Sequence, residues 1–301
     1  MANLRLANGH VKSTSILSAD TPNGLHEELE ALAVRNKARA IGVALHDLET
    51  GFRFSWCGDR WFHAASTIKV AVLLAVFRAA DEGRFRLDDS LHVRNRFFSV
   101  ADGSLFRLSH DRDATPELYA AIGRTVKISS LAHAMICGSS NLATNLLLEF
   151  VGVQYARTVL REAQVDGVEL RRGVEDHGAH EQGINNEATA DGLLSLLSAI
   201  RGDFLTPESK QQLIRILLEQ RFNSMIPAGL PPHAIVAHKT GEISTACHDI
   251  GIVYLPERKP YIAAILTEFD PEGEGRHETV AAISEAIYRS LLRTEPKSND
   301  D

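Results

Sequence analysis

The order of strand-like and helix-like segments along the chain is what most constrains its fold. Two strands are expected early, at residues 40–47 and 52–56, because β-branched and aromatic residues are bounded there by turn residues. Strand patterns return only after Pro232, at residues 235–240, 248–254 and 261–267. We therefore predict that early and late strands meet in one five-stranded antiparallel sheet.

Helical patterns lie between these strands and on their outer sides. Residues 173–188 have almost no apolar periodicity and are expected to form a loop. The other segments repeat apolar residues with the period of an amphipathic helix, at residues 25–37, 66–81, 129–136, 141–151, 155–163, 189–201, 207–220 and 278–292. The expected fold class is α/β, with the sheet flanked by the first and last helices and an all-helical lobe inserted.

Two lobes follow from this arrangement. We expect an α/β lobe made of residues 22–63 and 203–293, and a helical lobe made of residues 64–202. Residues 1–21 and 294–301 are expected to be loose termini. A cleft between two such lobes is where a small-molecule ligand usually binds.

Composition excludes several classes of partner. The 301 residues include 39 acidic and 32 basic side chains, for a net charge of −7, so we expect no nucleic-acid partner. No apolar run approaches the roughly 18 residues of a membrane span. Residues 1–20 lack the apolar core of a signal peptide, so the chain is expected to be cytoplasmic or already trimmed of an export signal. We expect a monomer.

The cysteines and histidines do not form a recognisable metal motif. Three cysteines, Cys57, Cys137 and Cys247, are too few and too widely spaced for a disulfide framework or a zinc site. The 13 histidines include no pair at the spacing of a helical metal site. We therefore expect neither a metal nor another cofactor.

Ser66 and Lys69 form an S-x-x-K motif at the start of a predicted helix. Three residues apart, their side chains share one helix face. A serine hydroxyl is a poor nucleophile until a base takes its proton, and a lysine can be that base when burial and nearby cations lower its pKa. The helix start also directs backbone N–H groups toward a reacting carbonyl.

Two more short motifs follow in order. The sequence Ser139-Ser140-Asn141 lies between two predicted helices, and Lys239-Thr240-Gly241 ends a predicted strand. The second of these supplies a cation, a hydroxyl and a backbone edge that a ligand can approach closely, since glycine has no side chain.

The three motifs together resemble the class A β-lactamase and penicillin-binding protein superfamily over about residues 24–292. The resemblance implies that Ser66 is acylated, that Ser139 passes a proton to the leaving group and that Asn141 binds the substrate amide. It implies that Lys239 and Thr240 hold a substrate carboxylate, that Gly241 leaves room for the acyl group, and that the N–H groups of Ser66 and Glu242 form the oxyanion hole.

The chain also departs from this family. Ser140 stands where class A enzymes typically have a structural aspartate. By its separation from Ser139, Glu175 is the expected deacylating base, but Ala179 replaces the asparagine that helps to hold the water. Gly173 replaces the arginine that normally braces the loop, although Arg171 and Arg172 are adjacent. Asp176 is the alternative base.

A further departure is the segment 91–127, which is about a dozen residues longer than in class A enzymes. It is expected either to wall the cleft or to be a passive surface insertion. The predicted function is hydrolysis of β-lactams through an acyl-enzyme on Ser66. The alternatives are a D-Ala-D-Ala carboxypeptidase or small esterase acting on acyl-D-Ala-like substrates, and a non-hydrolytic β-lactam or peptidoglycan sensor. Members of this family are usually periplasmic or secreted.

Overall fold

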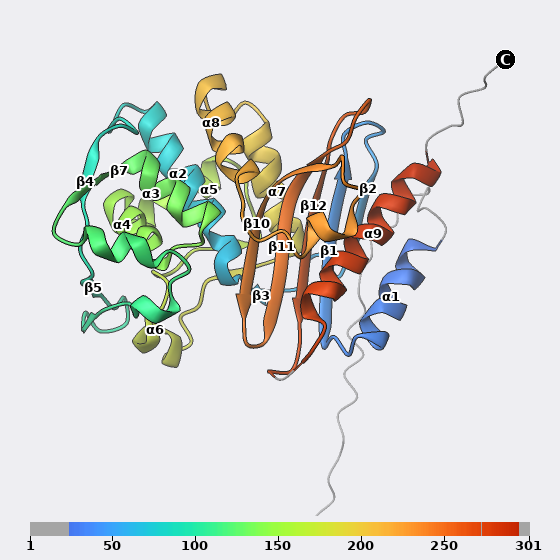
Figure 1. Ribbon diagram of the computed structural model, residues 1–301, viewed down its shortest axis with the longest axis horizontal. Helices are drawn as coiled ribbons and strands as arrows, with labels where there is room; N and C mark the ends of the chain where they lie inside the picture. The colour runs from blue at the N-terminus through green and yellow to red at the C-terminus, as the bar shows by residue number, and fades with distance from the viewer. Residues whose placement is uncertain (1–23, 272, 295–301) are drawn as a thin grey trace, which may run out of the picture.

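The computed structural model describes residues 24–271 and 273–294 (Figure 1). Its centre is a five-stranded antiparallel sheet, as predicted from the sequence. The strands lie in the order β10 (Ile235–Ile243), β11 (Ala246–Tyr254), β12 (Tyr261–Glu268), β1 (Ala40–Asp47) and β2 (Arg53–Trp56). The early and late strands join where β1 pairs with β12, with Val43 opposite Ile265.

Helices cover both faces of this sheet. On one face lie α1 (Leu25–Arg35) and α9 (Arg276–Thr294), and on the other lies α7 (Ala190–Arg201). Because both faces are covered, β11 and β12 are buried along almost their whole length. This explains why the late strands have continuous apolar runs rather than an alternating pattern.

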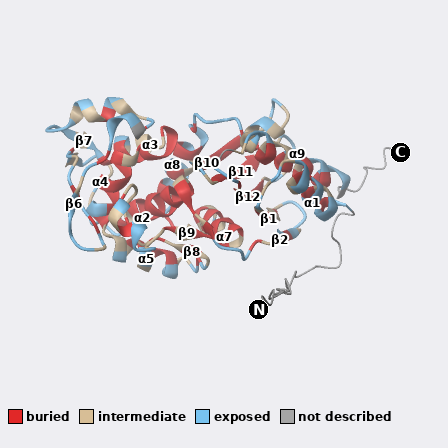
Figure 2. Ribbon diagram, turned by 90° about the horizontal axis from the view of Figure 1, so that it is seen from below, coloured by how far each residue is buried: buried red, intermediate tan, exposed pale blue. Residues whose placement is uncertain are grey.

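The remaining helices of ten or more residues form a second body beside β10. These are α2 (Lys69–Asp81), α3 (Ile128–Cys137), α4 (Asn141–Val151), α5 (Val153–Glu162) and α8 (Pro207–Leu218). The central one is α2, which is buried at every position from Lys69 to Phe77 (Figure 2). A helix that is apolar on all sides must lie inside a core, and α2 is enclosed by α4, α5 and α8.

Several short elements were not predicted. The region 173–188, expected to be a loop, contains the helix α6 (His177–Glu181) and the strand β9 (Glu187–Ala188). Strand β9 pairs with β3 (Phe62–His63) and β8 (Val168–Glu169). Strands of two residues contain no sequence period, so a pattern search does not find them.

The segment 91–127 also contains short elements. It includes a hairpin of β5 (Phe97–Phe98) and β6 (Leu105–Phe106), then the 3-10 helices η2 (His110–Arg112) and η3 (Pro116–Ala121). The two ends of the segment are joined where strand β4 (Ser90–His92) pairs with β7 (Thr125–Lys127).

The expected loose termini fall almost entirely outside the described residues. Residues 1–21 and 295–301 lie outside them, whereas Thr294 is the last residue of α9. In the described part of the chain, every helix is too short or too polar to cross a membrane.

Candidate active site

Ser66 lies on a 3-10 turn, η1 (Ala65–Ile68), and not inside an α-helix as predicted. This turn joins β3 to α2 and packs against β10 (Figure 1). Ala65 has the left-handed φ of 46°, which costs a non-glycine residue about 1–3 kcal/mol. The turn is held by Nδ1 of His63, which accepts the Ala65 N–H at 3.0 Å, and by Ala64 O, which accepts the Thr67 hydroxyl at 2.6 Å.

Lys69 is the first residue of α2, and its side chain is completely buried. Its Nζ donates to Asn141 Oδ1 at 2.7 Å, and to the O and Oγ atoms of Ser139 at 2.6 and 3.2 Å. Burial, followed by the charge of Lys239, lowers the pKa of Lys69 well below its usual value. A lysine in this environment is suited to exist as a neutral amine that accepts a proton.

The Ser139 hydroxyl lies between two amines. Lys239 Nζ donates to Ser139 Oγ at 3.1 Å and to Thr240 O at 2.7 Å. Burial lowers the pKa of Lys239 to about 7. Ser139 itself has a φ of 54°, so its backbone is held in a left-handed conformation at the end of α3. This arrangement allows Ser139 to receive a proton from one amine and pass it on.

Strand β10 approaches the Ser66 turn so closely that a side chain at position 241 would crowd the turn. A Cβ at Gly241 would lie 3.0 Å from Thr67 N and 3.1 Å from Ser66 N. The next residue, Glu242, therefore lies beside the Ser66 backbone. Its carboxylate points away to α9, where it accepts from Arg276 Nη2 at 2.7 Å and lies 2.9 Å from His277 Nε2.

Gly241→Ala is expected to lower kcat/KM by about tenfold or more, because the added methyl group must displace the backbone of Ser66. Overpacking of this kind typically costs about 1–3 kcal/mol. The control is Gly202→Ala, whose Cβ would meet no atom closer than 3.4 Å. Steady-state kinetics together with thermal unfolding of both variants test this; an unchanged kcat/KM in Gly241→Ala would show that the contact does not fix Ser66.

Two cavities open on either side of Ser66. One, of about 490 Å³, is lined by His63, Arg172 and Glu175, and the other, of about 240 Å³, by Ser139 and Thr240. Hollows of about 710 and 650 Å³ lie along α8, but in the described residues neither contains Ser66 or a motif lysine. The chemistry, rather than the size, marks the two cavities at Ser66 as the candidate site.

Glu175 reaches this site from the loop 173–188. Its Oε1 accepts from Asn141 Nδ2 at 2.6 Å, and its backbone has a φ of 57°. Arg172 braces the loop: it is almost fully buried and donates to Ile184 O at 2.6 Å and to Gly173 O at 3.0 Å. Position 173 has a glycine and no guanidinium, and Arg172, the preceding residue, supplies one to the loop instead.

Asn145 is a second brace that the sequence analysis missed. Its Nδ2 donates to Val174 O at 3.0 Å, and its Oδ1 accepts the Val174 N–H at 2.8 Å. An asparagine five residues after Ser140 resembles any other polar helix residue in the sequence. Only the folded loop brings Val174 to it and so fixes the residue before Glu175.

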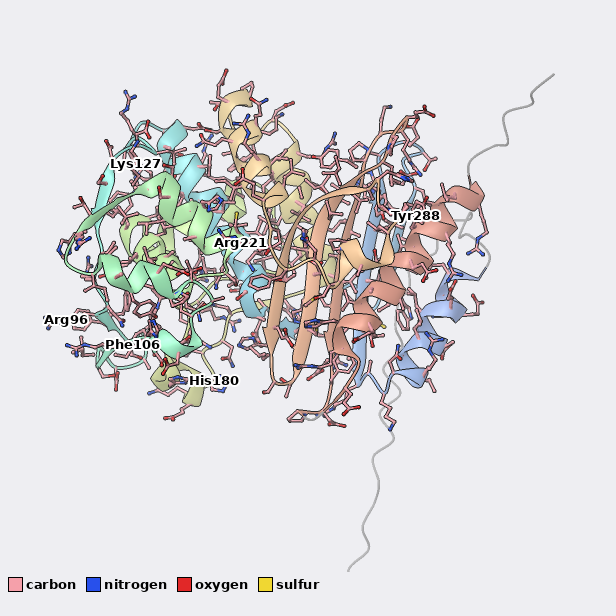
Figure 3. The ribbon with its side chains drawn as sticks, viewed as in Figure 1. Arg96, Phe106, Lys127, His180, Arg221 and Tyr288 are labelled. Atoms are coloured by element: carbon pink, nitrogen blue, oxygen red, sulfur yellow. The ribbon has the colours of Figure 1, made fainter. Side chains whose placement is uncertain are left out.

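Asp176, the alternative base, has both carboxylate oxygens engaged. It is 2% exposed; Oδ1 accepts the Ala179 N–H at 3.1 Å, and Oδ2 accepts the Val100 N–H at 3.0 Å. It caps α6 and joins that helix to the β5–β6 hairpin. Figure 3 shows Phe106 of this hairpin and His180 of α6 at the same edge of the helical body.

Asp113 is a further residue that no motif indicated. It comes from the segment 91–127 and is buried beside the second motif. Its Oδ2 accepts from Ser140 Oγ at 3.1 Å and from the Leu142 N–H at 2.9 Å. The only sequence signal was the unusual length of its segment.

Two groups among the described residues place His, Cys and Glu ligand atoms close enough for one cation. They are His133, Cys137 and Glu219, and Glu242, Cys247 and His277. In both groups the cysteine is buried, and burial raises the pKa of each thiol to about 12. Neither group contains Ser66, Lys69, Ser139 or Lys239, but Glu242 and His277 of the second group also line a cavity at Ser66.

Comparison with known proteins gives a consistent result. A family model described as "Beta-lactamase enzyme family" matches residues 24–291. The chain is 28% identical to Beta-lactamase ROB-1 of Haemophilus influenzae over 95% of this chain and 90% of that protein. It is 29% identical to a beta-lactamase of Kitasatospora aureofaciens, over 93% and 89% of the two chains.

Solved structures agree with these sequence matches. An ancestral class A beta-lactamase superposes with a TM-score of 0.77 at 27% identity, covering 88% of this chain and 99% of that one. A mutant of PBP-A, in an acyl-enzyme complex with penicillin G, superposes with a TM-score of 0.76 at 25% identity, covering 90% and 97%.

Proposed function

This chain belongs to the beta-lactamase enzyme family, and from that membership we propose that it hydrolyses β-lactams through a covalent acyl-enzyme on Ser66. The observation that carries the proposal is the meeting of Lys69 Nζ and Lys239 Nζ at the hydroxyl of Ser139, beside Ser66. Two buried amines sharing one hydroxyl form a path for protons between a nucleophile and a leaving group.

Acylation would begin when neutral Lys69 takes the proton of Ser66 Oγ as the oxygen attacks the β-lactam carbonyl carbon. The N–H groups of Ser66 and Glu242 would stabilise the oxyanion. As the C–N bond of the ring breaks, Ser139 would give its proton to the ring nitrogen and take one from a neighbouring lysine. Asn141 and Thr240 would hold the substrate, with Gly241 admitting its acyl group along β10.

Deacylation would use Glu175 to remove a proton from the attacking water. This role is supported by the bond from Asn141, which orients the Glu175 carboxylate toward the same side of the cleft as Lys69. Asp176 is the weaker candidate, because its two oxygens are already bonded to backbone N–H groups. Hydrolysis then releases the ring-opened product and restores Ser66.

Lys239 would attract the carboxylate of the substrate. Because its pKa is about 7, the free protein loses this charge as the pH rises above 7. The KM for benzylpenicillin is therefore expected to rise between pH 7 and 9, by up to about tenfold per pH unit, while that for an uncharged aryl ester stays level. Lys239→Arg should flatten the slope, because a guanidinium stays protonated. Steady-state kinetics across this range test the role, and equal slopes for both substrates in the wild type would contradict it.

All the residues assigned above come from one chain, so a single copy is sufficient for the reaction. We therefore propose that the protein acts as a monomer on small-molecule substrates, which bind in the two cavities lined by Ser66. A D-Ala-D-Ala carboxypeptidase would share the acylation steps. Ala179, in place of the family asparagine, is the observation that favours testing a D-Ala-D-Ala peptide beside the β-lactams.

A further inference from the structure

We propose that Asp113 is the residue that positions Ser139 and Asn141, taking over the work that the family gives to an aspartate at position 140. The inserted segment, residues 91–127, is then part of the catalytic machinery and not a passive surface insertion. This inference rests on the proposed acylation of Ser66.

The first support is the way in which Asp113 caps α4. Like any helix, α4 begins with backbone N–H groups that have no partner inside the helix. The hydroxyl of Ser140, its N-cap, accepts the Ala143 N–H at 3.2 Å. The Leu142 N–H donates to Asp113 Oδ2 instead, at 2.9 Å. A carboxylate at a helix N-terminus also interacts favourably with the helix dipole.

A serine at position 140 cannot accept both the Leu142 and the Ala143 N–H groups in the way that a carboxylate can. Its hydroxyl has one proton, which it donates to Asp113 Oδ2 at 3.1 Å. That bond fixes the rotamer in which Ser140 Oγ accepts from Ala143. Ser140 and Asp113 thus divide between them the hydrogen bonds that one carboxylate at position 140 would accept.

The second support is the set of contacts that residues 113–115 make with Gly138, on the other side of Ser139. The Thr115 N–H donates to Asp113 Oδ1 at 2.9 Å, and Thr115 Oγ1 donates to Gly138 O at 3.2 Å. A Cβ at Gly138 would lie 2.1 Å from Thr115 Oγ1, so the Thr115 side chain packs directly against the backbone of Gly138. Residues 113–115 therefore hold both neighbours of Ser139, whose left-handed φ needs such support.

The third support is electrostatic. Burial and then the charge of Lys239 lower the pKa of Lys69, whereas the charges of Asp113, whose side chain is buried, and of Glu175 raise it. Removing the charge of Asp113 should leave Lys69 neutral down to a lower pH. This effect separates Asp113 from a residue that only stabilises the fold.

The test moves the carboxylate between the two positions. The acylation rate constant is measured with a fluorescent penicillin for the wild type, D113A, S140D and D113A/S140D, with thermal unfolding of each. We expect D113A to acylate about 10- to 100-fold more slowly, corresponding to about 1.4–2.7 kcal/mol. S140D alone should also be slow, because two carboxylates then meet. The double variant should recover at least about tenfold over D113A.

The matched control is D111A, since Asp111 lies in η2 with a 93% exposed side chain.

A second variant remains informative if D113A folds poorly. D113N keeps the shape of the side chain and one acceptor oxygen, enough for one of the two N–H groups, which bond to different oxygens of Asp113. It loses the charge, so the acid limb of its acylation pH profile should shift to lower pH. The proposal is overturned if folded D113A acylates like the wild type, if S140D does not rescue it, or if the acid limb of D113N does not move. A wild type that takes up no penicillin would instead contradict the proposed function.

Discussion

Ser66→Ala is expected to abolish turnover of a chromogenic cephalosporin, with a fall in kcat on the order of 10⁵-fold or more, as for serine nucleophiles in other acyl-transfer enzymes. The turn between β3 and α2 carries two hydroxyls, those of Ser66 and Thr67. Ser66 lines both cavities, whereas Thr67 is buried and its hydroxyl donates to Ala64 O. The loss should not come from unfolding, because the change removes only one hydroxyl from a half-buried side chain. Thermal unfolding of the variant checks this.

The matched control is Ser130→Ala, which removes an exposed hydroxyl from α3, and it should turn over the cephalosporin like the wild type. Ser66→Ala should also take up no penicillin by intact mass. A variant that folds and still hydrolyses the cephalosporin would exclude Ser66 as the nucleophile.

Glu175→Gln is expected to slow deacylation by roughly 10²–10⁴-fold, the usual worth of a general base. Acylation should persist, because Lys69 and Ser139 bond to each other directly and are linked to this carboxylate only through Asn141. The amide keeps an oxygen that can accept from Asn141 Nδ2, so the loop geometry should be retained. Mass spectrometry after a pulse of benzylpenicillin should show the acyl-enzyme accumulating in the variant and clearing in the wild type.

The control for Glu175→Gln is Glu181→Gln, an exposed carboxylate on α6 of the same loop. It should clear its acyl group as the wild type does. If the wild type holds the acyl group for hours, the protein acts as a sensor or a slow transpeptidase relative. If Glu175→Gln turns over normally, the deacylating base is another residue.

Local patterns predicted much of this molecule. The strands β1, β10, β11 and β12 were found within a few residues because each contains a run of apolar residues and is bounded by turn residues. The three motifs were found because the chemistry they carry needs fixed residue types at short spacing. The structure brings Lys69, Ser139 and Lys239 together from places far apart in the chain.

What the sequence did not predict depends on contacts between distant segments. Asp113 reaches Ser140 across 27 residues, and no period or motif marks it. Arg172 braces the loop from one position before the place of the family's arginine. A residue-by-residue comparison finds Gly173 at that place and therefore indicates that the brace is missing. The 3-10 turn at Ser66 arises from the left-handed Ala65 and the His63 ring, a tertiary constraint that helix propensity does not contain.

The most direct test of the central claim is peptide mapping of the protein quenched seconds after mixing with benzylpenicillin. We predict that one peptide, the one carrying Ser66, gains one drug mass. The adduct should disappear within the turnover time in the wild type and persist in Glu175→Gln. Hydrolysis of the drug with no adduct on any peptide, or an adduct on a residue other than Ser66, would contradict the account.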